Sequence, residues 1–272
     1  MRHLVLGSEG QIGSHLVRYL EKQGHTVIEF DILNEPEQDL RIENNPLLEE
    51  YLQYCDIVHF LAYDVGGAKY LEKYQQSYDF IVNNCKIMVN TFELLKKYNK
   101  PFIFASSQMA DIDSSSYGML KRMGEDITKQ LGGLIVRFWN VYGYEKDEEK
   151  SHVITDFIKM AKYDKEINMR TDGTESRQFL YADDACECLE ILSESYNKIP
   201  RDKNLHISSF KWTTINEIAN KIDVLTSCSI NKGIRKDETQ HNAMNEPDPY
   251  ILNHWEPKTE LYDGIAKLLT VY

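Results

Sequence analysis

The sequence has few of the features that mark secreted, fibrous or membrane proteins. It holds five cysteines, an odd number, with no Cys-X-X-Cys pair, so we predict neither a disulfide framework nor a metal site. Seven prolines and 14 glycines among 272 residues exclude collagen-like and low-complexity chains. There is no apolar run of membrane-spanning length and no signal-peptide core at the N-terminus, so we expect a cytoplasmic protein that binds no membrane.

The chain also has fewer positive than negative side chains. The chain has 31 Lys and Arg residues against 43 Asp and Glu residues, a formal net charge of −12. This charge argues against non-specific attraction to nucleic acid. An anionic ligand therefore needs a local binding site that overcomes the field of the whole protein.

The first half of the chain alternates short apolar runs with segments of helical periodicity. This β-α-β alternation predicts an α/β fold, with a doubly wound parallel sheet of the Rossmann type covered on both faces. The expected strands are His3–Leu6, Thr26–Phe30, Ile57–Leu61, Phe102–Ala105 and Leu134–Phe138, and the clearest helices are Ile12–Lys22, Ser77–Tyr98 and Tyr117–Gln130.

The alternation loosens after Gly143 and returns only for one unit. We therefore expect residues 1–145 to form a dinucleotide-binding domain, to which residues 177–209 return. Residues 146–176 and 210–272 are expected to form a small, mostly C-terminal substrate-binding lobe, with helices near Val153–Lys162, Ile215–Leu225 and Leu261–Leu269.

A glycine-rich loop, Gly7-Ser-Glu-Gly10-Gln11-Ile12-Gly13, joins the first strand to the first helix. Such a loop lets the diphosphate of a dinucleotide approach the backbone at a helix N-terminus, although it can also be an ordinary strand–helix turn. Asp31 follows the second strand, where a carboxylate can bind the adenosine ribose and repel a 2′-phosphate. This favours NAD over NADP, unless Asp31 is only a turn residue.

A second group of residues suits hydride transfer. Ser107 ends the fourth strand, and Tyr117 and Lys121 lie four residues apart on one face of the next helix. A lysine and a nicotinamide cation would lower the pKa of the tyrosine, so that Tyr117 can remove a proton from an alcohol.

In this combination the sequence resembles the extended short-chain dehydrogenases/reductases, a family of NAD-dependent nucleotide-sugar epimerases and dehydratases. Asp56-Ile-Val-His-Phe-Leu61-Ala62 is similar to the family's "DVVFHLAA", and Asp39-Leu40-Arg is similar to a segment whose Asp contacts adenine. Further similar segments are Arg137-Phe-Trp-Asn140-Val-Tyr-Gly, Gly173-Thr-Glu-Ser-Arg177-Gln-Phe, Tyr181-Ala-Asp-Asp184 and Trp255-Glu-Pro-Lys258. The resemblance implies that Arg177 binds the diphosphate of a nucleotide sugar and that Asn140 and Gln108 contact this substrate. It also implies a homodimer formed through the helices Ser77–Tyr98 and Tyr117–Gln130.

Other residues narrow the subfamily. Ser107 is followed by Gln108 and Met109 rather than by the Asp-Glu pair of the dehydratases, which argues against dehydration. Gly66-Gly67 and Ser151-His152 resemble GDP-fucose synthase and GDP-mannose 3,5-epimerase, which favours a GDP-sugar. In those enzymes a cysteine and a His or Lys move protons. Met109 stands at the cysteine position and a thioether cannot do so, while His152 is either an auxiliary acid/base or only part of the pocket wall.

Three functions are compatible with these residues. The leading hypothesis is an NAD-dependent dehydrogenase or epimerase that oxidises a hydroxyl of a nucleotide sugar, at C4, with Tyr117 as the base. The alternative is an NAD(P)H-dependent 4-keto sugar reductase of the GDP-fucose synthase type. The third is a non-catalytic NAD-binding sensor or scaffold, against which the intact Ser107, Tyr117 and Lys121 argue.

Overall fold

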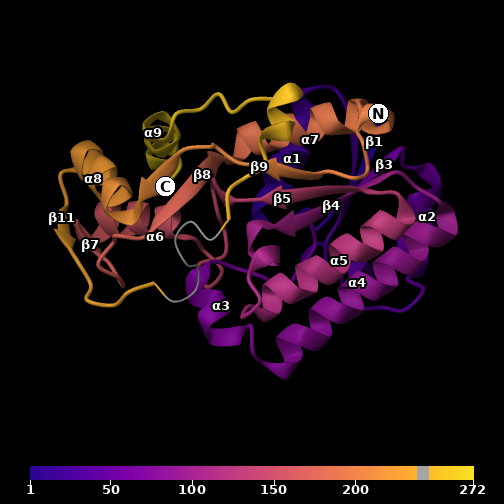
Figure 1. Ribbon diagram of the computed structural model, residues 1–272, viewed down its shortest axis with the longest axis horizontal. Helices are drawn as coiled ribbons and strands as arrows, with labels where there is room; N and C mark the ends of the chain where they lie inside the picture. Colours follow the sequence, from indigo (N-terminus) through magenta and orange to yellow (C-terminus); the bar gives the residue numbers. More distant parts are fainter. Residues whose placement is uncertain (238–244) are drawn as a thin grey trace.

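The computed structural model describes residues 1–237 and 245–272 and is built on a six-stranded parallel sheet (Figure 1). The strand order is β2-β1-β3-β4-β5-β9, in which the chain runs outward from β1 in both directions. This order is that of a doubly wound fold, and it brings the carboxyl ends of all strands to one edge. The strands are β1 (Arg2–Leu6), β2 (Thr26–Phe30), β3 (Ile57–Phe60), β4 (Phe102–Ser107), β5 (Leu134–Phe138) and β9 (Asn204–Ile207).

Helices cover both faces of this sheet, as Figure 1 shows. On one face α1 (Gln11–Lys22) and α7 (Ala182–Glu194) bury a core that includes Val5. On the other face α2 (Pro46–Tyr54), α4 (Tyr78–Tyr98) and α5 (Ser116–Leu131) cover a core that includes Leu4. Neighbouring residues of β1 thus point to opposite cores, which is why the strands are continuous apolar runs.

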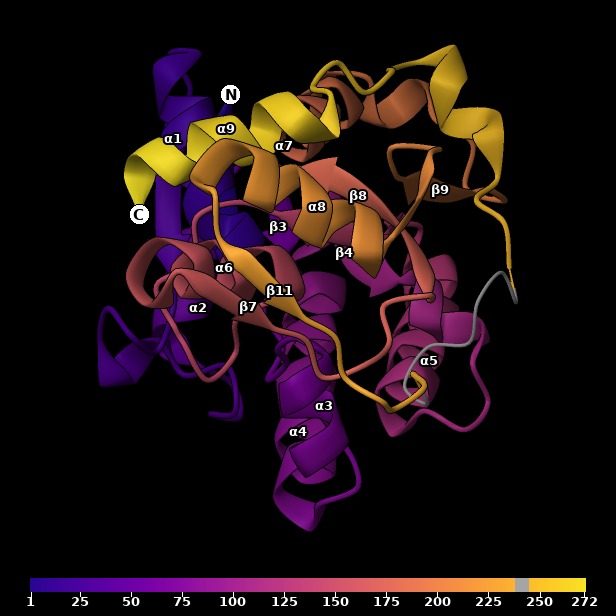
Figure 2. The ribbon, with the colours of Figure 1, turned by 90° about the vertical axis from the view of Figure 1, so that its left-hand side faces the viewer.

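A smaller lobe stands at the carboxyl edge of the sheet. It holds the sheet β10-β8-β6 and the two-stranded sheet β11-β7. Figure 2 shows α6 and α8 beside β7 and β11. The lobe has its own core around Ile158, Ile218 and Ile265. Its elements are β6 (Asn140–Tyr142), α6 (Val153–Lys159), β7 (Glu166–Asn168), β8 (Ser176–Tyr181), β10 (Trp212–Thr214), α8 (Ile215–Thr226), β11 (Ser229–Asn231) and α9 (Leu261–Val271).

The predicted doubly wound α/β fold is confirmed, and each predicted strand of the large sheet is present within two residues of its expected bounds. Within the range 177–209, α7 and β9 pack in the large unit, whereas β8 pairs with β6 and β10 in the small sheet. Neither α3 (Ala68–Tyr74) nor the three-residue strands were expected from the sequence pattern. None of the helices described is long and apolar enough to cross a membrane.

A buried ion pair and a serine hydroxyl join α5, β4 and β5. Glu125 on α5 accepts hydrogen bonds from Arg137 of β5 at 2.7 and 2.8 Å and from the Ser106 hydroxyl of β4 at 2.5 Å. Only 2% of the Glu125 side chain is exposed. Both charges are therefore desolvated: Arg137 compensates Glu125, and Arg137 itself is compensated by Glu125 and by Asp111, whose carboxylate accepts from it at 2.8 and 2.9 Å.

We predict that Glu125→Ala lowers the free energy of unfolding by about 3–5 kcal/mol, because it leaves Arg137 charged and partly unpaired inside the protein. Urea denaturation followed by circular dichroism measures the change. The control is Asp126→Ala on the same helix, which removes an exposed ion pair with Lys129 and should cost less than about 1 kcal/mol. Equal effects of the two variants would contradict this assignment.

Candidate active site

One large cavity lies between the carboxyl edge of the six-stranded sheet and the small lobe. Its volume is about 1250 Å³, which exceeds the range of about 300–1,000 Å³ for a pocket that holds one small ligand. The space therefore suits two ligands side by side. Every residue predicted to bind the cofactor or the substrate or to take part in catalysis lines it: Gly7, Gly10, Gln11, Ile12, Gly13, Asp31, Asp39, Leu40, Leu61, Ala62, Gly66, Gly67, Ser107, Gln108, Met109, Tyr117, Lys121, Asn140, His152 and Arg177.

The glycine loop is held by close backbone contacts at two of its glycines. A Cβ atom at Gly13 would lie 1.9 Å from the Gly7 carbonyl oxygen, and one at Gly7 would lie 2.8 Å from the backbone of Ala62. Gly7 also has a φ of +87°, which favours glycine. A Cβ atom at Gly10 would meet only the Gly7 oxygen, at 3.3 Å. Gly7 and Gly13 thus fix the turn, and Gly10 leaves the backbone accessible from the cavity.

This loop fits the diphosphate of a dinucleotide. Gly10 is the N-cap of α1, no side chain caps the helix, and its first turn holds no acidic residue. The first amide groups and the helix dipole therefore favour an anion at this end. Asp31 is fixed beside the loop because its carboxylate accepts hydrogen bonds from the backbone amides of Glu9 and Leu33, each at 3.0 Å.

Asp39, the residue expected to contact adenine, already has a partner. The Arg41 guanidinium donates three hydrogen bonds to its carboxylate, at 2.8 to 3.0 Å. These contacts hold the pKa of Asp39 below its usual value, against the effect of burial. Asp39 is therefore an oriented carboxylate at the cavity wall, with Leu40 buried behind it.

Ser107, Tyr117 and Lys121 converge at the centre of the cavity wall. All three are at least nine-tenths buried. Burial raises the pKa of Tyr117 to about 12, and a hydrogen bond with Ser107 opposes this rise. The chain alone therefore keeps Tyr117 protonated at neutral pH. The expected lowering of the pKa by Lys121 has no counterpart here, because the ammonium is turned toward other groups.

The Lys121 ammonium has two partners behind the site. It donates a hydrogen bond to the Ala105 carbonyl oxygen at 2.6 Å and lies 3.5 Å from the centre of the Tyr63 ring. The ring face attracts the cation, while burial lowers the pKa of Lys121 well below its ordinary value. Tyr63 also meets the Tyr117 ring edge to face, with 6.1 Å between the centres.

The short connection from Ser107 to Tyr117 is tightly folded. Residues Gln108–Asp111 form a 3-10 helix in which the Met109 amide donates to the Ser107 hydroxyl, and Ser115 caps α5 through the amide of Gly118. A Cβ atom at Gly118 would lie 2.1 Å from the Met109 carbonyl oxygen. The Met109 side chain is 2% exposed and packs in a core that includes Tyr117. It therefore forms part of the apolar wall of the cavity.

Gly66 and Gly67 allow a second segment to approach the site. A Cβ atom at Gly67 would lie 2.4 Å from the Ser151 carbonyl oxygen, and one at Gly66 would lie 2.8 Å from the Cα of Lys150. The Gly67 amide also donates to the Lys150 carbonyl oxygen at 2.9 Å. This pair of glycines therefore lets the loop before α6 close onto the large domain, which places His152 at the cavity.

His152 forms a dyad with Glu145. Its Nδ1 lies 2.5 Å from one carboxylate oxygen, and its backbone amide donates to the other at 2.9 Å. Burial opposes the charged form of both groups, but their mutual attraction raises the pKa of His152 and lowers that of Glu145. A histidine of this kind can hold and release a proton inside the cavity.

Arg177 and Asn140 come from neighbouring strands of the small sheet. The Arg177 guanidinium forms an ion pair with Asp237, and the Asn140 amide lies 3.5 Å from the Gln178 carbonyl oxygen. A diphosphate at Arg177 would therefore replace the Asp237 carboxylate. The backbone of Gln108 on the opposite wall accepts a hydrogen bond from Asn245 at 3.0 Å.

Among the lining residues that the sequence did not predict, Tyr63, Glu145 and Asp237 contact predicted site residues directly. Tyr63 stands where the "DVVFHLAA" pattern has its last alanine, and this difference was the available indication. Glu145 begins an acidic and lysine-rich stretch that has the composition of a solvated loop. Asp237 lies 60 residues after Arg177, so only the tertiary structure pairs them.

The chain was compared with known proteins. The model of the NAD-dependent epimerase/dehydratase family matches residues 3–208. A UDP-N-acetyl-alpha-D-glucosaminuronate decarboxylase of Bacillus cytotoxicus is 28% identical over 84% of this chain and 81% of its own length. A GDP-mannose 3,5-epimerase of Oryza sativa subsp. indica is 26% identical over 97% of this chain and 80% of its own length.

Solved structures share the fold. The UDP-glucose 4-epimerase of Thermotoga maritima, determined with UDP-glucose, superimposes with a TM-score of 0.80 at 22% identity and covers 100% of this chain and 97% of its own. The UDP-glucose 4-epimerase of Thermus thermophilus, determined with NAD, gives 0.76 at 20% identity over 97% and 96%. The likeness extends through both the large sheet and the small lobe.

We predict that Glu145→Gln lowers the pKa of His152, because the substitution removes the carboxylate that favours the imidazolium. Titration of histidine-labelled protein by NMR measures the pKa. The folded pKa of His152 is raised, so the pair stabilises the protein fully below the ordinary value of 6.5 and progressively less as the pH rises through the raised value. Glu145→Gln should therefore cost more stability at pH 6 than at pH 9, and an unchanged pKa would refute the dyad.

Proposed function

Because the chain belongs to the NAD-dependent epimerase/dehydratase family, we propose that it oxidises a hydroxyl of a nucleotide sugar, at C4, with Tyr117 as the base. It is an NAD-dependent enzyme of this family. The convergence of Ser107, Tyr117 and Lys121 on one cavity is the observation that carries the proposal. The room for two ligands supports it.

At one end of the cavity, separate groups of residues are proposed to bind the diphosphate, the ribose and the adenine of NAD. The amides at the start of α1 and the loop Gly7–Gly13 hold the diphosphate, and Asp31 holds the adenosine ribose. Asp39, Leu40, Leu61 and Ala62 line the adenosine side. Bound NAD⁺ supplies the hydride acceptor and a positive charge near Tyr117. The carboxylate of Asp31 repels a 2′-phosphate, which favours NAD over NADP.

In the proposed reaction Ser107 and Tyr117 bind the same substrate hydroxyl. Ser107 donates a hydrogen bond to its oxygen, and Tyr117, once ionised, takes its proton while the carbon loses hydride. Ionisation must overcome a pKa of about 12 that burial imposes. The Lys121 ammonium is 3.5 Å from the Tyr63 ring and 5.7 Å from the Tyr117 ring. A small movement toward Tyr117 would stabilise the phenolate.

The product depends on the fate of the keto sugar. Its release makes the enzyme a dehydrogenase, whereas return of the hydride to the opposite face makes it a 4-epimerase. A 4-keto sugar reductase of the GDP-fucose synthase type is the second candidate. The His152–Glu145 dyad favours it, because enzymes of this type also epimerise carbons next to the ketone, and a histidine held at the cavity wall can move the proton in that step.

The substrate end of the cavity is proposed to hold a GDP-sugar. Arg177 binds its diphosphate, while Asn140 and Gln108 line the sugar pocket with His152. Gly66 and Gly67 contribute by bringing the loop that carries His152 into place. Met109 is proposed as apolar wall only.

We predict turnover when the protein is incubated with NAD⁺ and GDP- or UDP-sugars, followed by NADH absorbance and by chromatography of the sugar nucleotides. Accumulating NADH identifies a dehydrogenase, and a new epimer without net NADH identifies an epimerase. Tyr117→Phe should lower kcat by about 10²–10⁴-fold with NAD affinity unchanged, because only the proton acceptor is removed.

The control for this experiment is Tyr144→Phe, which alters a tyrosine that lines the same cavity but packs against Tyr272. It should retain most of the activity. Retained turnover in Tyr117→Phe would overturn the assignment of the base. Consumption of NADH with keto-sugars alone would favour the reductase.

The helices α4 and α5 are proposed to form a homodimer interface. They lie side by side on one face of the protein (Figure 1). Large apolar side chains are exposed on both: Tyr78 and Val89 on α4, and Met119 and Met123, one turn apart, on α5. A second copy of the chain would remove these side chains from water.

We predict that the wild-type protein elutes as a dimer and that the double variant Met119→Glu, Met123→Glu elutes as a monomer, as measured by size exclusion with light scattering. Charges buried at an interface oppose association. The control, Val224→Glu, changes an exposed residue of α8 and should leave the dimer intact. A monomeric wild type would refute the interface.

A further inference from the structure

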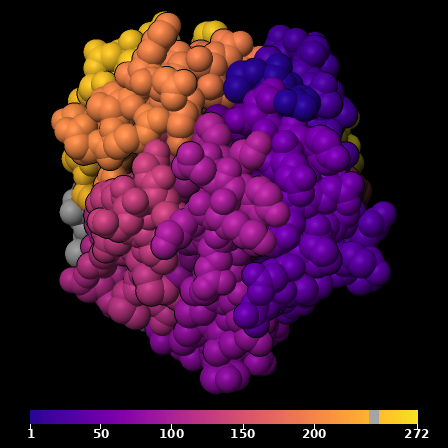
Figure 3. All heavy atoms as spheres, turned by 90° about the vertical axis from the view of Figure 1, so that its right-hand side faces the viewer, coloured from indigo at the N-terminus to yellow at the C-terminus, as the bar shows by residue number. Residues whose placement is uncertain are grey.

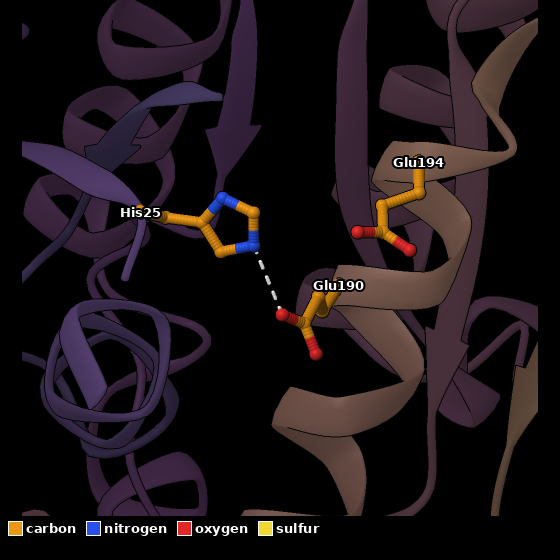
Figure 4. A group of neighbouring side chains, drawn as sticks. All are labelled: His25, Glu190 and Glu194. Atoms are coloured by element: carbon orange, nitrogen blue, oxygen red, sulfur yellow. Dashed lines mark hydrogen bonds and ion pairs between the residues drawn. The ribbon is translucent and has the colours of Figure 1, made fainter. Parts of the chain in front are cut away.

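A cluster of metal-ligand side chains lies away from the cavity. His25 precedes β2, and Glu190 and Glu194 lie one turn apart on α7, so that both carboxylates reach the side of the helix that faces His25 (Figure 4). One ligand atom from each of the three lies within 4.8 Å of the others. His25 follows α1 and precedes β2, so the cluster is at the end of the sheet opposite the Gly7–Gly13 loop.

Two of the three side chains are already oriented. His25 Nε2 lies 3.0 Å from a Glu190 oxygen, and the Tyr19 hydroxyl donates to the other oxygen at 3.1 Å. The second ring nitrogen of His25, Nδ1, lies 3.1 Å from the Met1 nitrogen. For Nε2 to bind a metal ion, Nδ1 must carry the ring proton, so the α-amino group of Met1 must be neutral and accept that proton.

Glu194 differs from Glu190. Its side chain makes no hydrogen bond or ion pair to any of the residues described in the structure. It faces a second cavity of about 300 Å³, which Met1 also lines. Figure 3 shows the first residues of the chain beside the segment that follows α7 on this surface. The exposed Glu194 carboxylate can therefore be reached by an ion from solvent, and its lone pairs are available.

The neighbouring buried histidines are also short of partners. His3 is fully buried with its ring centre 4.8 Å from that of His25, and its Nε2 has no hydrogen-bond partner among the described residues. The positive group nearest to the cluster is the α-amino group of Met1, 3.1 Å from His25 Nδ1.

We propose that His25, Glu190 and Glu194 bind a Zn²⁺ ion. One imidazole nitrogen and two carboxylates, completed by water, form a tetrahedral set of the kind that Zn²⁺ accepts at about 2.0–2.2 Å. The ligand atoms must then approach to roughly 3.4 Å from each other, as those bond lengths require. Exposed Glu194 can supply this movement by changing rotamer. The ion would link α7 to the turn before β2 and replace the His25–Glu190 hydrogen bond.

The cluster has a metal-free interpretation, in which His25 and Glu190 are only an ion pair that joins α7 to the turn. The two interpretations differ at Glu194, which contributes nothing to the ion pair but is a ligand in the metal site. Glu194 is exposed, so its substitution leaves the fold intact. It is therefore the residue on which the test is built.

The test uses the full chain, prepared without a histidine tag and stripped with EDTA, and titrates it with ZnCl₂ by calorimetry. We expect one site in the wild type, at least tenfold weaker binding in Glu194→Gln, and a rise in Tm on zinc addition that this variant lacks. The control is Glu187→Gln on the same helix, whose carboxylate pairs with Lys258 and which should bind zinc like the wild type.

NMR of the labelled histidines shows where the ion binds. Zinc should shift the His25 resonances and leave those of His152 in place. No binding by the wild type, or binding that survives in Glu194→Gln, would overturn the proposal. Zinc that binds without moving His25 would also overturn it, since such binding belongs to other ligands.

Discussion

The ion pair between Glu125 and Arg137 is the interaction on which the candidate active site depends. It lies behind the cavity and joins three elements, because Glu125 is on α5, Arg137 is on β5 and the third partner, Ser106, is on β4. Ser107 directly follows Ser106, and α5 carries both Tyr117 and Lys121. The geometry of the proposed catalytic residues is therefore set by a polar contact that none of them makes. A buried pair of this kind fixes register and orientation more than it adds stability.

The side chain of Lys121 is also buried at this edge, close to Tyr117. The ammonium is held by the Ala105 carbonyl and by the face of Tyr63, so it stays within 5.7 Å of the Tyr117 ring without touching the hydroxyl. In the chain alone Tyr117 keeps its proton, because burial raises its pKa to about 12. If Tyr117 is the base, as proposed, its ionisation needs a positive charge beside it, which the nicotinamide of bound NAD⁺ would supply. Under the proposed function, proton removal is therefore linked to the presence of the oxidant.

The sequence was sufficient for the parts of the structure that depend on local patterns. Continuous apolar runs predicted the strands of the parallel sheet, and the residues predicted for the site, from Gly7 to Arg177, line one cavity. It was insufficient where function depends on pairs distant in sequence. The ion-pair partner of Arg177 is 60 residues away, and Tyr63, in the loop after β3, meets Lys121 only in the folded structure. His25 and Glu190 are similarly joined only by the packing of α7 against α1.

The acidic net charge has a local consequence at the cavity. Several of its cations already face carboxylates: Arg177 faces Asp237, Arg170 faces Glu72, and Lys150 faces Asp64. A diphosphate that binds to any of these must displace a carboxylate and return it to water, which offsets part of the attraction. The amides at the start of α1 carry no such competitor, since no acidic side chain stands in the first turn. Under the proposed function the two halves of the cavity therefore differ: the diphosphate of NAD meets a preformed site, whereas that of a nucleotide sugar at Arg177 would have to exchange with Asp237. Such an exchange would favour a highly charged ligand, so a sugar nucleotide would bind in preference to a free sugar without any contact to the base.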